Sequence, residues 1–143
     1  MKDEHDVWLI YELSSEKTLG NSMFHIQGEN RGNGDRIYEI KHQQFYTMIA
    51  RDKSVLASLI FKMAQMLEVI STASMVHSDL KPENITVQFD KAGTRIESIS
   101  LVDFGSSFAF DESLRFSGTT PEYLSPEMIH FSETLKQNPS IRT

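Results

Sequence analysis

Two short alternating segments near the middle of the chain constrain its fold most strongly. Residues 85–89 (Ile-Thr-Val-Gln-Phe) and 96–102 (Ile-Glu-Ser-Ile-Ser-Leu-Val) alternate apolar and polar side chains, as half-buried β-strands do. The residues between them run from Asp90 to Thr94 and include Gly93, a typical turn residue. The sequence therefore predicts an antiparallel β-hairpin, in which the two outer ends lie side by side.

Polar loops flank this predicted hairpin on both sides. The loop before it contains Asp79, Lys81 and Asn84, and the loop after it begins with Asp103. Because the outer ends of the hairpin meet, we expect Asp79 and Asn84 to lie near Asp103. Carboxylate and amide oxygens suit Mg²⁺, which binds through few protein ligands and keeps its waters and the phosphates of its substrate. A lysine beside them can neutralise charge on a transferring phosphoryl group.

The longest periodic segment precedes the first of these loops. Apolar side chains recur at steps of three and four over residues 54–74, which predicts a long helix with Ser54 as its N-cap and its apolar stripe in the core. A looser pattern predicts a second helix over residues 38–51. Residues 7–13 have the composition of a buried strand. Residues 28–36 contain three glycines and two asparagines, which is typical of a turn-rich surface loop.

Composition and charge limit the class of protein. The length of 143 residues fits one domain, and 39% hydrophobic and 24% charged residues are ordinary globular values. A net charge of −6 argues against a nucleic-acid partner, and the lack of cysteine excludes disulfides and thiol chemistry. No uninterrupted apolar run approaches the roughly 20 residues of a membrane span, and the N-terminus lacks signal-peptide features. We therefore expect no membrane span and an intracellular, cytoplasmic location.

Three motifs surround the hairpin in a fixed order. They are His-Ser-Asp-Leu-Lys-Pro-Glu-Asn at 77–84, Asp-Phe-Gly at 103–105, and Gly-Thr-Thr-Pro-Glu-Tyr-Leu-Ser-Pro-Glu at 118–127. They resemble the catalytic loop, the magnesium motif and the end of the activation segment of the eukaryotic protein kinases. The resemblance covers roughly residues 7–131. Lys81, together with the third motif, favours the serine/threonine type over the tyrosine type.

The resemblance implies an α+β, protein-kinase-like fold and a role for each matching residue. The fold would comprise a hinge strand, the long helix, the catalytic-loop hairpin and the activation segment. Asp79 would orient the substrate hydroxyl and accept its proton, and Lys81 would steady the γ-phosphate of ATP. Asn84 and Asp103 would hold Mg²⁺.

The remaining implied roles concern adenine and the activation segment. Phe104 would pack against His77, Thr120 would brace Asp79 and Lys81, and the neighbouring Thr119 leaves the register of that threonine open by one residue. The further residues implied in these two regions are Tyr11, Glu12, Leu13 and Thr86 at the adenine, and Gly105 and Glu127 in the activation segment.

The chain also departs from the family pattern. Ser78 stands where the family usually carries an arginine that pairs with a phosphorylated activation loop, so we do not expect control through that contact. Residues 28–36 resemble an insertion. No segment matches the glycine-rich loop, its strand-borne lysine or the later helices. We therefore expect a partial domain over 7–131 and a tail over 132–143. We also expect exposed apolar surface on the long helix, and no activity from the chain in isolation.

Three functions remain in competition. The first is a protein serine/threonine kinase that uses ATP and Mg²⁺ on a protein substrate. The second is a non-catalytic pseudokinase or scaffold fragment. The third is a metal-dependent hydrolase that uses the same carboxylates, although this function does not explain Pro82 or the Pro126-Glu127 pair. The oligomeric state is left open.

Overall fold

The computed structural model describes residues 17–30, 36–110 and 120–137. The α-helices in these ranges are α1 (Leu19–Met23), α2 (Gln44–Arg51), α3 (Lys53–Thr72) and α4 (Pro126–Gln137). The strands are β1 (Phe24–Asn30), β2 (Arg36–His42), β3 (Met75–Val76), β4 (Ile85–Phe89), β5 (Ile96–Leu101) and β6 (Phe108–Ala109). Single turns of 3₁₀ helix are η1 (Pro82–Asn84), η2 (Phe104–Ser106) and η3 (Pro121–Tyr123).

The predicted central hairpin is present as β4 and β5. The strands pair antiparallel from Ile85 opposite Leu101, with one irregularity between Gln88 and Phe89. At the turn, the Asp90 carboxylate accepts a hydrogen bond from the Thr94 amide at 2.7 Å. Gly93 has a φ of +69°, a conformation that side-chain-bearing residues rarely adopt. Local alternation and turn chemistry therefore predict this element correctly.

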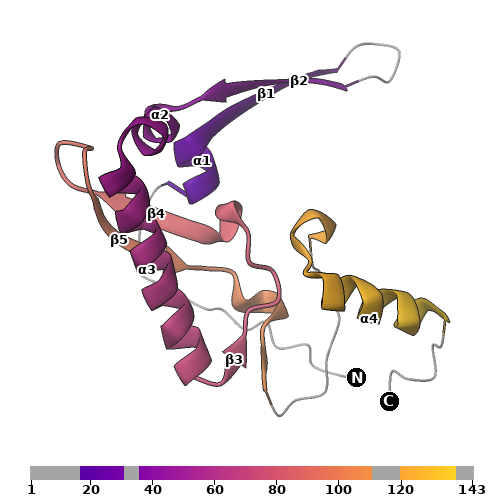
Figure 1. The fold of residues 1–143 in the computed structure, drawn as a ribbon. Helices are drawn as coiled ribbons and strands as arrows, with labels where there is room; N and C mark the ends of the chain where they lie inside the picture. Colours follow the sequence, from indigo (N-terminus) through magenta and orange to yellow (C-terminus); the bar gives the residue numbers. More distant parts are fainter. Residues whose placement is uncertain (1–16, 31–35, 111–119, 138–143) are drawn as a thin grey trace, which may run out of the picture.

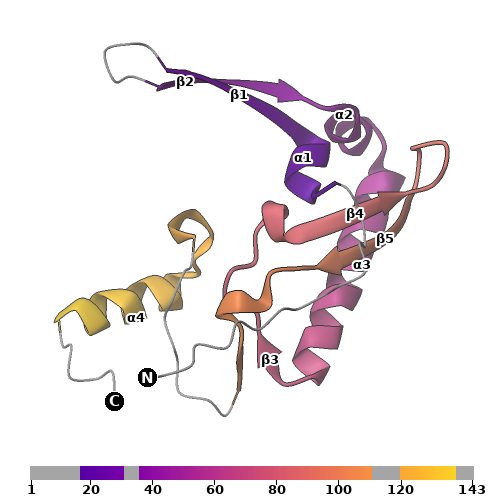
Figure 2. The same ribbon diagram turned by 180° about the vertical axis from the view of Figure 1, so that it is seen from behind.

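The hydrophobic core lies where α3 crosses the β4–β5 hairpin and α1 and α2 close one end (Figures 1 and 2). Its members come from five elements, α1, α2, α3, β4 and β5. The members are Leu19, Phe45, Leu59, Ile85, Val87 and Ile96. The aromatic rings of Phe45 and Phe89 meet edge to face at 4.9 Å. Because Ile85, Val87 and Ile96 of the hairpin pack in this core, the outer end of the hairpin supports the flanking loops.

Helix α3 begins one residue before the predicted start and ends at Thr72. Its N-cap is Asp52, whose carboxylate accepts hydrogen bonds from the Ser54 amide at 2.8 Å and the Ser54 hydroxyl at 2.7 Å. The prediction of Ser54 as the cap was therefore wrong, because the aspartate two residues earlier satisfies the free amide. Further along, Lys62 Nζ donates to the Glu97 carbonyl at 2.8 Å and ties the helix to β5.

One side of α3 remains uncovered in the structure. Leu59 is buried, whereas Ile60, Phe61 and Val69 are 58%, 64% and 69% exposed. The expected exposure of apolar surface on this helix is thus confirmed, and only part of its stripe lies in the core. By length and composition alone, α3 would also be able to cross a membrane. A core helix can meet the same criterion, so the absence of a membrane span stays a prediction.

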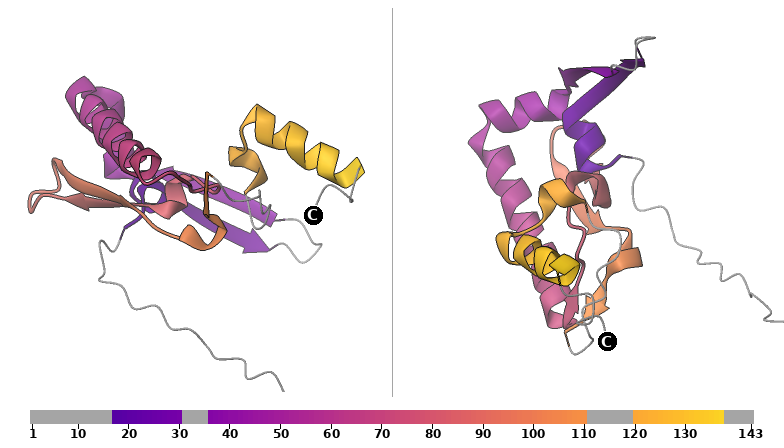
Figure 3. Two further views of the ribbon diagram at one scale, coloured as in Figure 1. Left: turned by 90° about the horizontal axis from the view of Figure 1, so that it is seen from below. Right: turned by 90° about the vertical axis from the view of Figure 1, so that its right-hand side faces the viewer.

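Residues 24–42 differ most from the sequence-based expectation. Strands β1 and β2 form an antiparallel ribbon that projects from α1 and α2 (Figure 3). The predicted loop over 28–36 was therefore wrong at residues 28–30 and 36, which are strand, while residues 31–35 lie outside the described ranges. The start of the predicted helix over 38–51 was also wrong, since the helix begins at Gln44. The ribbon places Gly28 opposite Tyr38, where an added Cβ would lie 3.1 Å from the ring. Glycine here makes room for an aromatic neighbour and does not mark a turn.

Helix α4 stands apart from the hairpin and its covering helix (Figure 1). It begins at Pro126, a favourable residue for a first helical turn, and extends to Gln137. The hydroxyls of Ser132 and Thr134 donate to carbonyls of the preceding turn, at Ile129 and His130, and so do not interrupt it. The expected tail over 132–143 is therefore helical up to Gln137, and residues 138–143 lie outside the described ranges.

Candidate functional site

The two polar loops meet at the outer end of the hairpin, as the sequence predicts. The Val102 amide donates to the Asn84 carbonyl at 2.9 Å, one residue beyond the last strand pair. Pro82 opens the single turn η1, which the Asn84 amide closes by donating to the Lys81 carbonyl at 3.0 Å. Asn84 and Asp103 therefore occupy neighbouring ends of β4 and β5.

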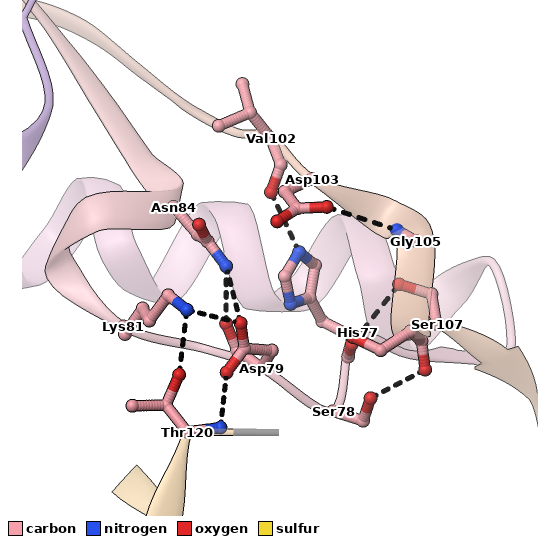
Figure 4. Close-up of polar contacts among 11 residues, drawn as sticks. His77, Ser78, Asp79, Lys81, Asn84, Val102, Asp103, Gly105, Ser107 and Thr120 are labelled. Carbon is pink, nitrogen blue, oxygen red and sulfur yellow. Dashed lines mark hydrogen bonds and ion pairs between the residues drawn. The ribbon is translucent and has the colours of Figure 1, made fainter. Parts of the chain in front are cut away.

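Asp79 is the centre of a hydrogen-bond network (Figure 4). Its side chain is 5% exposed, and its Oδ2 atom lies 2.6 Å from Lys81 Nζ and accepts from Asn84 Nδ2 at 3.1 Å. Its Oδ1 atom accepts from the Thr120 amide at 2.9 Å. Lys81 Nζ also donates to Thr120 Oγ1 at 2.7 Å, so lysine and threonine brace the carboxylate together. Asn84 Nδ2 further donates to the Asp79 carbonyl at 2.9 Å.

The network fixes the charge of Asp79. The hydrogen bond from Lys81 is the largest cause that lowers the pKa of this carboxyl, and the contacts with Thr120 lower it further. Burial acts in the opposite direction, and the net pKa is about 2, below the usual 3.8. The same pairing raises the pKa of Lys81. Near neutral pH the pair is therefore a carboxylate held against an ammonium group.

Asp103 lies across from this network and is exposed. Its backbone has a φ of +63° and a ψ of +68°, which is the left-handed region that favours glycine. Its Oδ1 atom accepts from the Gly105 amide at a long 3.4 Å. The next residue, Phe104, packs edge to face on His77 with ring centroids 5.0 Å apart, as expected. His77 Nε2 lies 3.0 Å from the Val102 carbonyl.

Two hydrogen bonds in this region had no sequence signal. Ser78 Oγ donates to the Ser106 carbonyl at 2.6 Å, and Ser107 Oγ donates to the His77 carbonyl at 3.2 Å. Both join residues about thirty positions apart. Serine is common in loops, and a hydroxyl bond to a distant carbonyl leaves no pattern in the local sequence. The serine at position 78, where the family usually carries an arginine, is the nearest signal. It indicates that the contact with a phosphorylated activation loop is missing, but not that Ser78 bonds to Ser106.

The other residues singled out from the sequence are dispersed. Thr86 is buried in β4, and its hydroxyl donates to the Ser100 carbonyl at 3.3 Å. Glu127 is exposed in the first turn of α4, where a hydrogen bond from the Ser125 side chain lowers its pKa. Four of the residues lie outside the described ranges: Tyr11, Glu12, Leu13 and Thr119.

The donor set at the end of the hairpin fits Mg²⁺. Asn84 turns its NH₂ group toward Asp79, and its side-chain oxygen is directed away from that carboxylate (Figure 4). The exposed carboxylate of Asp103 stands at the neighbouring strand end. Within the described ranges, no three histidine, aspartate or glutamate side chains gather as a metal cluster. One amide oxygen and one carboxylate are nevertheless enough for Mg²⁺, which keeps waters and binds substrate phosphates.

Comparison with known proteins agrees with this geometry. The family model for the protein kinase domain matches residues 2–140. The chain belongs to the protein kinase family. The expected α+β kinase fold is thereby confirmed, and the arrangement of α3, the hairpin and the loops is that of a kinase.

Several curated kinases are similar to this chain over most of its length. The serine/threonine-protein kinase DCLK2 of Mus musculus is 30% identical over 129 residues, which are 90% of this chain and 16% of the relative. The serine/threonine-protein kinase DCLK1 of Rattus norvegicus is also 30% identical, with 27% of its length covered. The mitogen-activated protein kinase pmk-3 of Caenorhabditis elegans is 26% identical over 132 residues. The chain thus spans about a quarter or less of these relatives.

Proposed function

We propose that this chain carries the phosphoryl-transfer residues of a protein serine/threonine kinase, which moves the γ-phosphate of ATP to a serine or threonine hydroxyl of a protein. The observation that carries this proposal is the network on Asp79. Three different residues, Lys81, Asn84 and Thr120, donate to one nearly buried carboxylate. Several hydrogen bonds that fix one side chain are typical of a group whose position matters for chemistry.

Asp79 would act on the acceptor hydroxyl. A carboxylate with a pKa of about 2 is a weak base, so its first contribution is to accept a hydrogen bond from the hydroxyl and aim its oxygen at the phosphorus atom. Phosphoryl transfer passes through a loose transition state, in which the hydroxyl loses its proton late. Asp79 would take the proton at that stage.

Lys81 and the end of the hairpin would manage negative charge. The Lys81 ammonium stands 2.6 Å from Asp79, and it would stay beside the transferring group and offset its charge. Asn84 and Asp103 would hold Mg²⁺ through their oxygen atoms. The ion, when bound, supplies neutralisation of phosphate charge. Thr86 in β4, with Tyr11, Glu12 and Leu13, would form the adenine side of the site.

The names of the relatives support the serine/threonine assignment. Two of those similar to this chain are named serine/threonine-protein kinases. Lys81, placed between Asp79 and Thr120, is the sequence feature that favours the same acceptor type. The family match leaves the metal-dependent hydrolase without support. The pseudokinase alternative predicts the same fold without transfer, and a cytoplasmic location remains a prediction.

The test is transfer of labelled phosphate from ATP to proteins or peptides that offer serine, threonine or tyrosine. The assay uses the natural gene product, with any sequence that flanks these 143 residues, because we expect the 143-residue chain alone to be inactive. Wild type should label serine or threonine in the presence of Mg²⁺. The variant Asp79→Asn should be slower by about 100-fold or more.

The control for this assay is Ser98→Ala, which removes an exposed hydroxyl on the hairpin, remote from Asp79. It should label at the wild-type rate. Labelling that is equal in wild type and Asp79→Asn, or confined to tyrosine, would overturn the proposal. Correctly folded protein that transfers no phosphate would establish the pseudokinase alternative.

A further inference from the structure

A reciprocal pair of hydrogen bonds joins the loop that carries Asp79 to the segment that follows Asp103. Ser78 Oγ donates to the Ser106 carbonyl at 2.6 Å, and Ser107 Oγ donates to the His77 carbonyl at 3.2 Å (Figure 4). Each of the two segments therefore supplies one donor and one acceptor. All four residues are buried or half-buried, where a hydrogen bond competes less with water. We call the Ser78 and Ser107 hydroxyls with these two carbonyls the hydroxyl latch.

The latch connects two strained positions. Ser78 has a φ of +62° and Asp103 a φ of +63°, both in the left-handed region that non-glycine residues seldom occupy. Such conformations persist where surrounding contacts hold them. Ser78 is itself a donor in the latch, and Asp103 lies three residues before the acceptor Ser106. Ser78 immediately precedes Asp79, and Asp103 is itself a residue to which the proposed function assigns chemistry.

The neighbours of Asp103 are anchored, Val102 to Asn84 and His77 and Phe104 to His77, but Asp103 itself makes few contacts. Its side chain is exposed, and its bond to the Gly105 amide is long at 3.4 Å. Downstream, β6 pairs with β3 through two residue pairs, Val76 with Phe108 and Met75 with Ala109. The latch lies between these features. Its two hydrogen bonds therefore help to fix the position of the Asp103 segment relative to the catalytic loop.

We propose that Ser78 and Ser107 are positioning residues, and that the hydroxyl latch holds the Asp103 segment against the catalytic loop without a charge on the activation segment. The assignment of chemistry to Asp103 rests on the proposed function. The latch consists of neutral groups, so its strength should depend little on ionic strength. A cation–phosphate pair at the same place would form only on phosphorylation, and added salt would weaken it.

Hydrogen exchange in the 143-residue chain tests the latch without any requirement for activity. The probes are the amides of Ser107 and Phe108, followed by NMR at low and high salt. Ser78→Ala and Ser107→Ala should each speed exchange of these amides by about tenfold, because each removes one hydrogen bond and strands a carbonyl. The rates should be alike at both salt concentrations.

The matched pair Ser107→Thr and Ser107→Val separates the hydroxyl from side-chain volume. Ser107 has a φ of −73° and a ψ of 151°, which both β-branched residues adopt readily. Threonine should restore exchange to within about twofold of wild type, and valine should behave as alanine does. In these variants, the exchange rates of the Val87 and Ile99 amides in the hairpin should equal those of wild type. In the control Ser98→Ala, the exchange rates of the Ser107 and Phe108 amides should also equal those of wild type.

Equal exchange in Ser107→Thr and Ser107→Val would overturn the proposal, and so would an effect spread evenly over the hairpin. If Ser78→Ala fails to fold, the two Ser107 variants still decide the matter. In the transfer assay, Ser107→Val should lower the rate and Ser107→Thr should restore it. If exchange depends on the hydroxyl at position 107 but the protein transfers no phosphate, the proposal of the hydroxyl latch holds. Only the proposed function is then overturned.

Discussion

At the scale of single residues, Asp79 concentrates the chemistry of the molecule. Lys81 and Asn84 reach it from its own loop, whereas Thr120 comes from 41 positions away. The contacts with Lys81 and Thr120 favour the charged form of the carboxylate, and together they outweigh the cost of its burial. The pKa of about 2 is thus a direct consequence of which groups the fold brings to this one side chain.

This pKa predicts how the stability of the protein depends on pH. The carboxyl has a pKa of about 2 when folded and about 3.8 when unfolded, so the charged form stabilises the folded state. The stabilisation, about 2 kcal/mol, is fully present above pH 4 and is lost as the pH falls from 4 toward 2. Urea unfolding of wild type and Asp79→Asn between pH 7 and pH 2 measures it.

The two proteins should differ most at neutral pH and converge as the pH approaches 2. Ser98→Ala serves as the comparison, because it removes an exposed hydroxyl on the same hairpin and no titrating group, so its difference from wild type should not change with pH. A difference between wild type and Asp79→Asn that stays constant across this pH range would contradict the account of the network.

The residue scale also shows how far sequence reasoning reaches into the site. The approach of Asn84 to Asp103 follows from a local hairpin, so alternation and a turn were enough to predict it. Contact of Thr120 with Asp79 came from resemblance to a family and from no local pattern. The bonds of Ser78 and Ser107 were missed because nothing in a serine indicates which distant carbonyl it will meet.

At the scale of elements, α3 presents two chemically similar positions in opposite environments. Leu59 is buried in the core, and the next residue, Ile60, is 58% exposed. Leu59→Ala should lower the free energy of unfolding by about 2–4 kcal/mol, because it leaves a cavity between the helix and the hairpin. Ile60→Ala should cost less than about 1 kcal/mol. Urea denaturation monitored by circular dichroism measures both.

Equal losses for Leu59→Ala and Ile60→Ala would contradict the packing of α3 described above. An intact fold is required for the comparison, and the buried Val87 in β4 provides a reference. Val87→Ala should fall in the range of Leu59→Ala, since it lies in the same core.

Elements with a regular pattern were predicted well, and those whose pattern was masked by other signals were not. The hairpin and the long helix follow from alternation and from steps of three and four. The β1–β2 ribbon was not predicted, because a glycine such as Gly28 is typical of turns and outweighs the alternation of Ile26 and Ile40 with polar neighbours. No helix is predicted over the residues of α4, because its serine and threonine residues weaken periodicity.

At the scale of the whole molecule, the described residues form one core with a site at its edge. Helix α3 and the hairpin provide the rigid part, and the ribbon and α4 extend from it (Figures 1 and 3). Apolar side chains at Phe61, Val69 and Phe110 remain exposed. This surface is what a kinase-like core presents when part of its α3 face is uncovered, and the expectation from sequence holds on this point.

If the proposed function holds, the end of the hairpin binds a metal ion together with ATP. Mn²⁺ replaces Mg²⁺ at oxygen sites and broadens the NMR signals of nearby nuclei. Titration of the 143-residue chain with Mn²⁺ and ATP should broaden the amide signals of Asn84 and Asp103 first, and Asp103→Asn should remove that effect. The exposed turn at Asp90 should not respond to ATP. Broadening at Asn84 and Asp103 that ATP leaves unchanged, or that persists in Asp103→Asn, would contradict the claim.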